Sequence, residues 1–341
     1  MPMIQAMSDA VEEDFGTGER SPKLLVLKGA GGKAFCAGGD VKAVAEGASL
    51  GPGVPGTLRS DFFKHEYKLD YKLAQIAKHR ALLSIWDGVV MGGGVGISIH
   101  GTFRVATETT VFAMPETVIG IFPDVGSAYV LSRLPAGLGQ YLGLTGARLR
   151  SDDLLHCGLA THFVPRDRLP DLQEALVQDD GRDPSSVLEK FATEAFPESS
   201  MLAKNQPWID LVFGGAGSVE EIVQRLEAST EVGGKIPQEK RFAKEWARGT
   251  LNILRKASPT ALKVAHRHIA WAADATLKKC FERDFRVMQN LMTNRDFGEG
   301  VRALLVDKDN NPAWNPPTLE GVSKPAVDAL FAGIGAQELD I

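Results

Sequence analysis

Two glycine-rich turns are the first residues of this sequence whose types and spacing can do chemistry. One is "MGGGVG" at 91–96, which places four glycines in six positions after an apolar run. The other is "KAFCAGGDVK" at 33–42, in which Asp40 is suited to cap a following helix. Glycine loses more conformational entropy on folding than other residues, so such clusters indicate positive φ or close approach of the backbone to a neighbour or ligand.

Both turns are predicted to follow a strand and to lead into a helix. Each can therefore aim a backbone N–H group, supported by the positive end of a helix, at one point. Two such donors form an oxyanion hole, and glycine suits the role because no Cβ blocks the substrate oxygen. The alternative for each turn is a tight connection packed against a neighbouring strand.

Nucleotide-binding motifs fit the first turn poorly. The stretch "GAGGKA" at 29–34 matches G-x-G-x-x-A after a strand. A dinucleotide site also needs an acidic residue about 20 positions on, where this chain has "GASLGPGVPG". A Walker A loop is excluded because Ala34 follows Gly32-Lys33 and Leu27 stands where the first glycine belongs. A nucleotide-dependent oxidoreductase is therefore disfavoured.

The longer motifs resemble one known superfamily. "AFCAGGD", "GGG" and "MPETVIGIFPDVGSAYVLSRL" are similar to the crotonase (enoyl-CoA hydratase/isomerase) superfamily, from about residue 3 to beyond 310. The resemblance implies an α/β fold, with a crotonase-like ββα spiral core and a helical C-terminal region. It also implies an acyl-CoA substrate whose thioester oxygen is held by two backbone amides, here those of Gly39 and Gly93.

The acidic residues indicate which reaction of the superfamily to expect. Hydratases of the superfamily use two glutamates; Gly96 stands at the first position here, and the second is Glu116 of the "PE" motif. Asp124 in "FPDVG" stands where hydratases usually have glycine. The surrounding string is similar to the 3-hydroxyisobutyryl-CoA hydrolases, thioesterases of valine catabolism. Thioester hydrolysis is therefore expected, with another crotonase reaction, hydration or isomerisation, as the alternative.

The same resemblance implies roles for three acids. Glu116 and Asp124 are expected to be catalytic at the thioester, and Glu66 of "FKHEYKL" is expected to help bind substrate. Hydrolysis needs either a base that activates water or a carboxylate that attacks directly, and Glu116 fits both. Asp124 either orients the substrate hydroxyl or handles the proton of the leaving thiolate. The plainer alternatives are a helix cap for Asp124 and a solvated first-turn acid for Glu116.

Other reactive side chains give weaker signals. Cys36, Cys157 and Cys280 are odd in number and widely separated, and no metal-ligand spacing occurs, so neither disulfides nor a metal site is expected. Cys36 is interpreted as a packed thiol. His266 and His268 lack a nearby acid in the sequence and are interpreted as helix-surface residues. No cofactor is expected beyond the CoA that belongs to the substrate.

The pattern of the chain predicts the elements that position these residues. Strands are expected at 23–29, 81–87, 103–106 and 111–113, an amphipathic helix at 3–15, and helices near 40–47, 61–79, 93–101, 126–134 and 137–145. After Pro170 the predictions become helical: 186–195, 218–229, 238–256, 259–273, 275–292 and 296–306. Residues 1–170 are accordingly predicted to form the acyl-CoA-binding core and residues 171–341 a helical region.

Composition excludes some classes of partner. With 341 residues, 44% of them hydrophobic, the chain can bury a large core. The net charge of −5 and the lack of a Lys/Arg run exclude a nucleic-acid binder. The most apolar segment, 81–100, is interrupted by Asp87 and glycines and predicts a buried strand and turn, not a membrane span. The C-terminal helices are expected either to cover the site or to mediate association into a homo-oligomer.

The beginning of the sequence departs from the family pattern. Crotonases of this type usually open with paired strands, whereas this sequence begins in a segment with helical spacing, so the opening strands are expected to be missing. The segment also lacks the Arg-rich character of a transit peptide. The resemblance implies a mitochondrial protein if the source is eukaryotic, and a cytoplasmic one otherwise. A truncated, non-catalytic homologue is the alternative from a different functional class.

Overall fold

The computed structural model describes residues 1–15, 22–47, 58–193, 200–230 and 238–341. The chain divides into two compact units, each assembled from several segments. Unit 1 comprises Met1–Gly39, Phe62–Ala113 and Arg148–Ala203, and unit 2 comprises Asp40–Asp61, Met114–Ala147 and Lys204–Ile341. The division of the chain at residue 170 remains a prediction. The Gly and Pro residues of "GASLGPGVPGTLRSD" at 47–61 predict a surface loop, and residues 48–57 of it lie outside the described residues.

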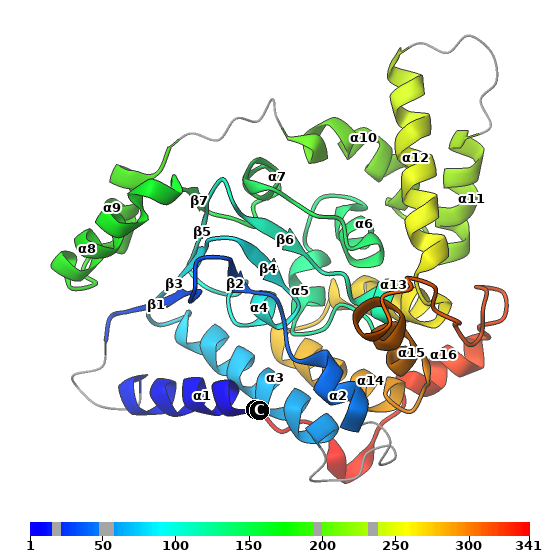
Figure 1. The fold of residues 1–341 in the computed structure, drawn as a ribbon, viewed down its shortest axis with the longest axis horizontal. Coiled ribbons are helices and arrows are strands. Elements are labelled where there is room, and N and C mark those ends of the chain that lie inside the picture. The colour runs from blue at the N-terminus through cyan, green and yellow to red at the C-terminus, as the bar shows by residue number, and fades with distance from the viewer. Residues whose placement is uncertain (16–21, 48–57, 194–199, 231–237) are drawn as a thin grey trace. The chain divides into compact units, whose positions relative to one another are not determined.

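Within the described residues, the strands belong to unit 1 and form two parallel sheets (Figure 1). The first sheet has the order β1-β3-β5-β7, made of Leu24–Lys28, Ala81–Trp86, Phe103–Ala106 and His162–Phe163. The second has the order β2-β4-β6, made of Ala34–Cys36, Val89–Met91 and Val111–Ala113. The four predicted strands are confirmed, whereas β2, β4 and β7 were not predicted as strands and have only three, three and two residues.

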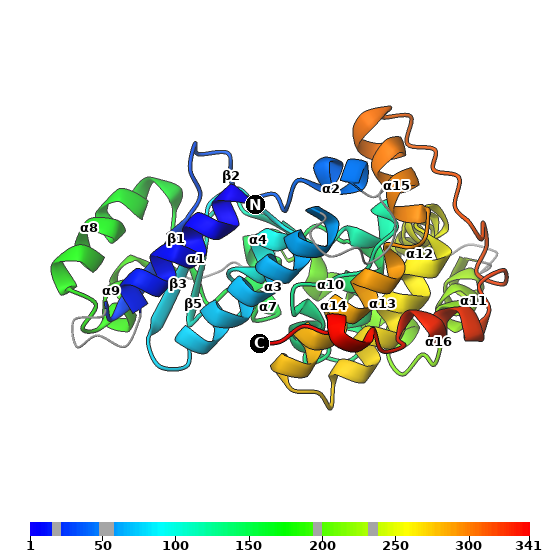
Figure 2. The same ribbon diagram turned by 90° about the horizontal axis from the view of Figure 1, so that it is seen from below.

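Helices cover the four-stranded sheet of unit 1. Helices α8 (Leu169–Asp179) and α9 (Pro184–Phe191) contribute Leu172, Leu176 and Leu188 to a buried cluster with Leu83 and Val105 of the sheet. Helices α1 (Pro2–Phe15) and α3 (Leu58–Ile76), the latter mainly in unit 1, run side by side (Figure 2). They are joined by an ion pair of 2.9 Å between Lys72 and Glu12. The shorter helices of unit 1 are α4 (Gly93–Gly96), α7 (Ser151–His156) and the 3-10 turn η3 (Arg166–Arg168).

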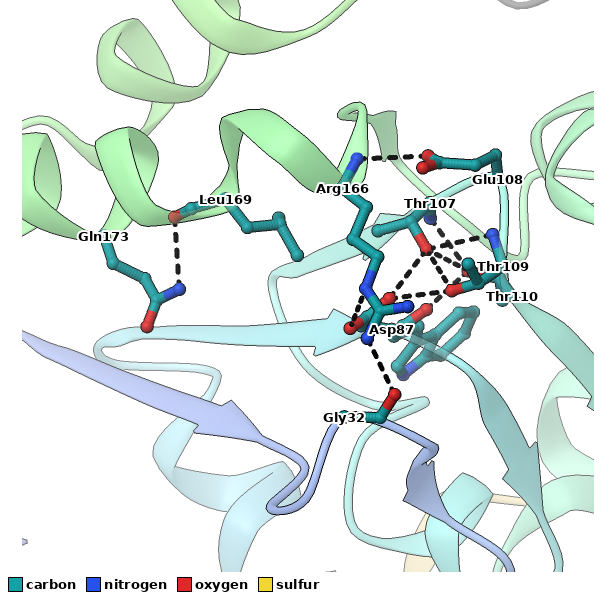
Figure 3. Close-up of polar contacts among 10 residues, drawn as sticks. Gly32, Asp87, Thr107, Glu108, Thr109, Thr110, Arg166, Leu169 and Gln173 are labelled. Atoms are coloured by element: carbon teal, nitrogen blue, oxygen red, sulfur yellow. Dashed lines mark hydrogen bonds and ion pairs between the residues drawn. The ribbon is translucent and has the colours of Figure 1, made fainter.

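Figure 3 shows the polar cluster that holds the turn between β1 and β2. Arg166 donates to the carbonyl of Gly32 (2.7 Å) and pairs with Asp87 (3.1 Å), and Asp87 also accepts from Thr109 (2.7 Å). A Cβ on Gly29 would collide with the carbonyl oxygen of Ala34. The glycines of "GAGGKA" are therefore explained by a tight turn into β2.

Unit 2 is helical in the part of the chain that the structure describes. Figure 1 shows α11 (Val219–Thr230) packed along the long helix α12 (Gln238–Lys256). Helix α10 (Met201–Phe213) lies mainly in this unit. The predicted helices from 218 onward are confirmed, with ends shifted by a few residues. No described helix has the length and apolar character needed to cross a bilayer. The other elements are α2 (Val41–Gly47), η2 (Glu116–Ile119), α5 (Ser127–Leu131), α6 (Leu138–Thr145), α13 (Pro259–Ala272), α14 (Leu277–Leu291), α15 (Asp296–Val301), the π-helical turn η5 (Arg302–Val306), α16 (Lys324–Leu330) and η6 (Gly335–Gln337).

Candidate active site

The two glycine turns follow neighbouring strands of one sheet. Strands β2 and β4 pair in parallel, with Ala34 opposite Val89 and Cys36 opposite Val90. Because parallel strands end at the same edge of a sheet, the turns that follow them begin side by side. A Cβ on Gly38 would lie 3.4 Å from the carbonyl oxygen of Met91, which places the two turns in direct contact.

The structure brings Gly39, Gly93 and Glu66 together within unit 1. A Cβ on Gly93 would overlap the Oε1 atom of Glu66 and would lie 3.8 Å from the amide nitrogen of Gly39. Gly92, which precedes α4, has φ 51° and ψ −123°, a conformation open only to glycine. The Gly93 amide belongs to the first turn of a helix, where N–H groups have no intrahelical partner. The predicted amide pair is therefore adjacent to a buried carboxylate.

Two further side chains contact these glycines and their surroundings. A Cβ on Gly39 would collide with the ring of Phe62, one turn before Glu66 on α3, so this turn also has no room for a side chain. Burial raises the pKa of the Cys36 thiol, and the Glu66 carboxylate raises it further. A protonated thiol is a poor nucleophile, which agrees with the interpretation of Cys36 as a packed side chain.

Glu116 begins the 3-10 turn η2 in unit 2 and is only 5% exposed. The alternative that it is a solvated first-turn acid is therefore wrong. The turn is anchored at Thr117, whose hydroxyl donates to the carbonyl of Leu144 (3.1 Å) and whose carbonyl accepts from the amide of Ser258 (3.1 Å). It closes at Gly120, where φ is 81°. The position of Glu116 is fixed by these buried contacts.

Asp124 lies on a second turn of unit 2 and is also 5% exposed. The amide of Ser127 donates to the carbonyl of Asp124 (2.9 Å), and the two residues between them, Val125 and Gly126, have φ of 53° and 72°. Helix α5 begins at Ser127 with Gly126 at its N-cap position. Asp124 lies two residues before that position, so the helix-cap alternative is wrong.

The prediction that His266 and His268 lie on a helix surface is also wrong. Both are on α13, and they are 8% and 0% exposed. His266 Nε2 donates to the carbonyl of Ala216 (3.1 Å), and burial lowers the pKa of its imidazole. His268 Nε2 donates to Oδ1 of Asp284 (2.5 Å) on α14. The sequence did not indicate this acid because it lies on a neighbouring helix.

A second buried carboxylate was missed for the same reason. Asp296 is 0% exposed and accepts from the hydroxyl of Ser258 (2.7 Å) and the amide of Asn315 (2.9 Å). Burial raises the pKa of this carboxyl. Ser258, which was predicted as the N-cap of α13, also accepts from the amide of Ala261 (3.2 Å). Ser258 thus caps α13 and contacts Asp296 through its hydroxyl, while its backbone amide anchors the Glu116 turn.

Within the described residues, no group of three or more His, Cys, Asp or Glu side chains is arranged to hold a metal ion. The predicted site residues thus comprise two backbone amides with a carboxylate in unit 1, and the buried carboxylates of Glu116 and Asp124 in unit 2. Amides stabilise negative charge on an oxygen, and carboxylates move protons or attack a carbonyl. This set suits acyl chemistry.

Comparison with known proteins agrees with this set. The profile of the enoyl-CoA hydratase/isomerase family matches residues 1–331. A protein of Arabidopsis thaliana called 3-hydroxyisobutyryl-CoA hydrolase 1 is 42% identical over 337 residues, which is 96% of this chain and 83% of that protein. The mitochondrial 3-hydroxyisobutyryl-CoA hydrolase of Xenopus laevis is 39% identical over 324 residues, 93% of this chain and 79% of its own length.

Two solved structures are similar over nearly the whole chain. A carnitinyl-CoA dehydratase from Mycobacterium thermoresistibile has a TM-score of 0.85 at 34% identity, with 99% of this chain and 91% of that one covered. An enoyl-CoA hydratase from Rhodobacter sphaeroides has a TM-score of 0.82 at 32% identity, with coverage of 100% and 92%. The predicted crotonase-like α/β fold is confirmed. The chain belongs to the enoyl-CoA hydratase/isomerase family.

Proposed function

We propose that this enzyme hydrolyses the thioester of 3-hydroxyisobutyryl-CoA and releases CoA. The observation that carries the proposal is the adjacency of the Gly39 and Gly93 turns and the Glu66 carboxylate at the ends of two neighbouring strands. Relatives of about 40% identity that carry this activity in their names support the choice of substrate. The relatives named as mitochondrial support a mitochondrial location if the source is eukaryotic.

In the proposed reaction the amides of Gly39 and Gly93 bind the thioester oxygen and stabilise its negative charge as the carbonyl carbon is attacked. Glu66, which overlaps the position of a Gly93 Cβ, helps to bind the substrate. The C–S bond then breaks, the electron pair leaves with sulfur, and the CoA thiolate takes a proton. The products are 3-hydroxyisobutyrate and CoA.

Glu116 has two roles open to it. As a general base it takes a proton from water, whose oxygen forms the new C–O bond. As a nucleophile it forms a mixed anhydride and expels CoA, and water then cleaves the anhydride. Repeated turnover in H₂¹⁸O, followed by peptide mass spectrometry, tests the nucleophilic route. ¹⁸O in the Glu116 carboxylate establishes an anhydride that water cleaves at the Glu116 carbonyl, because the general-base route never labels this residue.

Asp124 either orients the substrate hydroxyl or delivers the proton to the thiolate. Isobutyryl-CoA, which lacks the hydroxyl, separates these roles. If Asp124 orients the hydroxyl, Asp124→Asn lowers kcat far more with 3-hydroxyisobutyryl-CoA than with isobutyryl-CoA. If Asp124 protonates the thiolate, the variant lowers kcat equally with both.

The test of the activity is release of free CoA thiol from 3-hydroxyisobutyryl-CoA, measured with wild type, Glu116→Gln and Asp124→Asn. We expect release by wild type and a fall in kcat of about 10²–10⁴ in Glu116→Gln, the range for losing a general base. Matched Tm values show that the variant is folded. Release that survives both substitutions would contradict the proposed roles.

Hydration or dehydration of an acyl-CoA is a second candidate, favoured by the names of the two similar solved structures. Crotonyl-CoA and 3-hydroxybutyryl-CoA test it, with loss or gain of the double bond as the readout while the thioester stays intact. A non-catalytic homologue is the third alternative, and it predicts that neither reaction occurs. We also propose that the chain associates with itself into a homo-oligomer. Sedimentation measures this association.

A further inference from the structure

A buried pair of side chains contacts the turn that carries Asp124. The Oδ2 atom of Asp284 accepts a hydrogen bond of 2.7 Å from the amide of Gly126, and its Oδ1 atom accepts from His268. Both side chains are 0% exposed. The pair therefore lies beneath the turn, connected to it through a backbone amide two residues after Asp124.

The imidazole ring of His268 also packs against an aromatic residue of the segment that carries Asp124. The ring of Phe122 meets it edge to face, with centroids 5.4 Å apart and planes at 89°, and the Trp271 ring stacks with it at 6.0 Å. Within the described residues, Nδ1 of His268 has no hydrogen-bond partner. Its polar contact is thus with Asp284, and the remainder of the ring packs against the residue two positions before Asp124.

The turn needs such support because its backbone is strained. Val125 has φ 53° and is fully buried, and a β-branched residue in the left-handed region is an outlier that persists only when surrounding contacts hold it. A hydrogen bond from an amide to a carboxylate is about twice as strong as one to a neutral acceptor. A buried carboxylate in turn requires a partner, which His268 supplies.

We propose that Asp284 is a positioning residue, oriented by His268, that holds the Asp124 turn in the conformation needed for thioester hydrolysis. The inference rests on the proposed role of Asp124. It predicts that loss of Asp284 lowers kcat with little effect on KM, because the substrate still binds while one reacting carboxylate is displaced. A displacement of about 1 Å costs on the order of 100-fold in rate.

The experiment compares Asp284→Ala, Asp284→Asn and Leu291→Ala in the full chain, with 3-hydroxyisobutyryl-CoA as substrate. Leu291 is a matched structural control, because it is fully buried on the same helix, about 10 Å along the axis from Asp284. We expect Asp284→Ala to lower kcat about 100-fold with KM within threefold. Leu291→Ala should lower Tm and leave kcat within threefold of wild type. A folded Asp284→Ala variant with wild-type kcat would overturn the proposal.

A second readout keeps the test decisive if Asp284→Ala does not fold. The asparagine of Asp284→Asn still accepts from the Gly126 amide but without charge, so exchange of that amide with deuterium should be faster and kcat several-fold lower. Exchange and kcat identical to wild type would overturn the proposal. Amide exchange decides whether Asp284 holds the turn, whereas Asp124→Asn decides whether the turn serves the reaction, so the two failures are distinguishable.

Discussion

The candidate site residues of unit 1 and those of unit 2 are held in place by different means. In unit 1 the amides of Gly39 and Gly93 are positioned by the register of β2 and β4, and the turns have no room for a Cβ. In unit 2 the Glu116 turn is anchored through Thr117 to Leu144 and to the amide of Ser258, and the Asp124 turn is held by the buried Asp284 carboxylate. The turns of unit 1 depend on the absence of side chains and those of unit 2 on buried polar contacts, so substitutions should affect the two sets of turns differently.

Among the substitutions that test this comparison, the largest effect is expected from Gly93→Ala. The methyl group would overlap the Glu66 carboxylate and displace the amide, so we expect kcat to fall by about 10²–10³, the cost of losing one oxyanion donor. Steady-state thiol release measures it. The double variant Gly93→Ala/Glu66→Ala removes the collision, so its kcat should return to that of Glu66→Ala alone. A folded Gly93→Ala variant with wild-type kcat would contradict the amide role.

Ser258→Ala should produce the next largest effect, on stability. It removes a helix cap and leaves the buried carboxylate of Asp296 without its hydroxyl partner, so the free energy of unfolding should fall by about 3 kcal/mol. Ser323→Ala is the matched control, because Ser323 caps α16 in the same way but is exposed, and about 1 kcal/mol is expected. Urea titration measures both. Equal losses would break the claim that unit 2 depends on buried polar pairs.

The stability of the protein should depend on pH through His266. Burial lowers the pKa of His266 below its ordinary value of 6.5, so the unfolded chain takes up this proton first as pH falls. The free energy of unfolding should therefore decrease as pH falls through 6.5, until the folded-state pKa is reached. His266→Gln, which can still donate to Ala216, should reduce this dependence between pH 7.5 and 5.5. Denaturation at a series of pH values measures it, and an unchanged slope would contradict the assignment.

The smallest effect is expected from Gly249→Ala on α12. A Cβ there meets nothing within 4 Å, and alanine favours a helix interior over glycine by about 0.5–1 kcal/mol. The variant should raise Tm slightly without changing kcat. It is the counterpart of Gly93→Ala: the same substitution should stabilise the protein where the glycine has open space and inactivate it where the backbone approaches a carboxylate.

The same contrast explains how much the sequence could predict. The glycine turns, Asp40 as the cap of α2, and most helices follow from local pattern, and the structure confirms them; the Asp40 carboxylate accepts from the amide of Ala43 at 3.1 Å. Gly39, Gly93 and Glu66 were expected at one place and are together in unit 1. Their catalytic roles, and those of Glu116 and Asp124, stay predictions.

The parts that could not be predicted depend on long-range partners. His268 and Asp284 lie 16 positions apart on two helices, and Ser258 and Asp296 lie 38 apart. Neither separation is a periodicity of one helix or strand, so no local pattern marks the pair. Strands β2, β4 and β7 have two or three residues each, and their pairing across the sheets, more than their composition, makes them strands.

The parallel pairing of the first sheet affects when this sheet can form during folding. Leu24 pairs with Ala81, and Ala106 with Phe163, so each of these contacts closes a long loop. Loop entropy opposes such contacts before they can contribute, which makes parallel sheets slow to form. At a synthesis rate of about 5–20 residues per second, β1 is made several seconds before its partner strand β3. The sheet that supports unit 1 is therefore a late product of folding, although its first strand is among the earliest residues made.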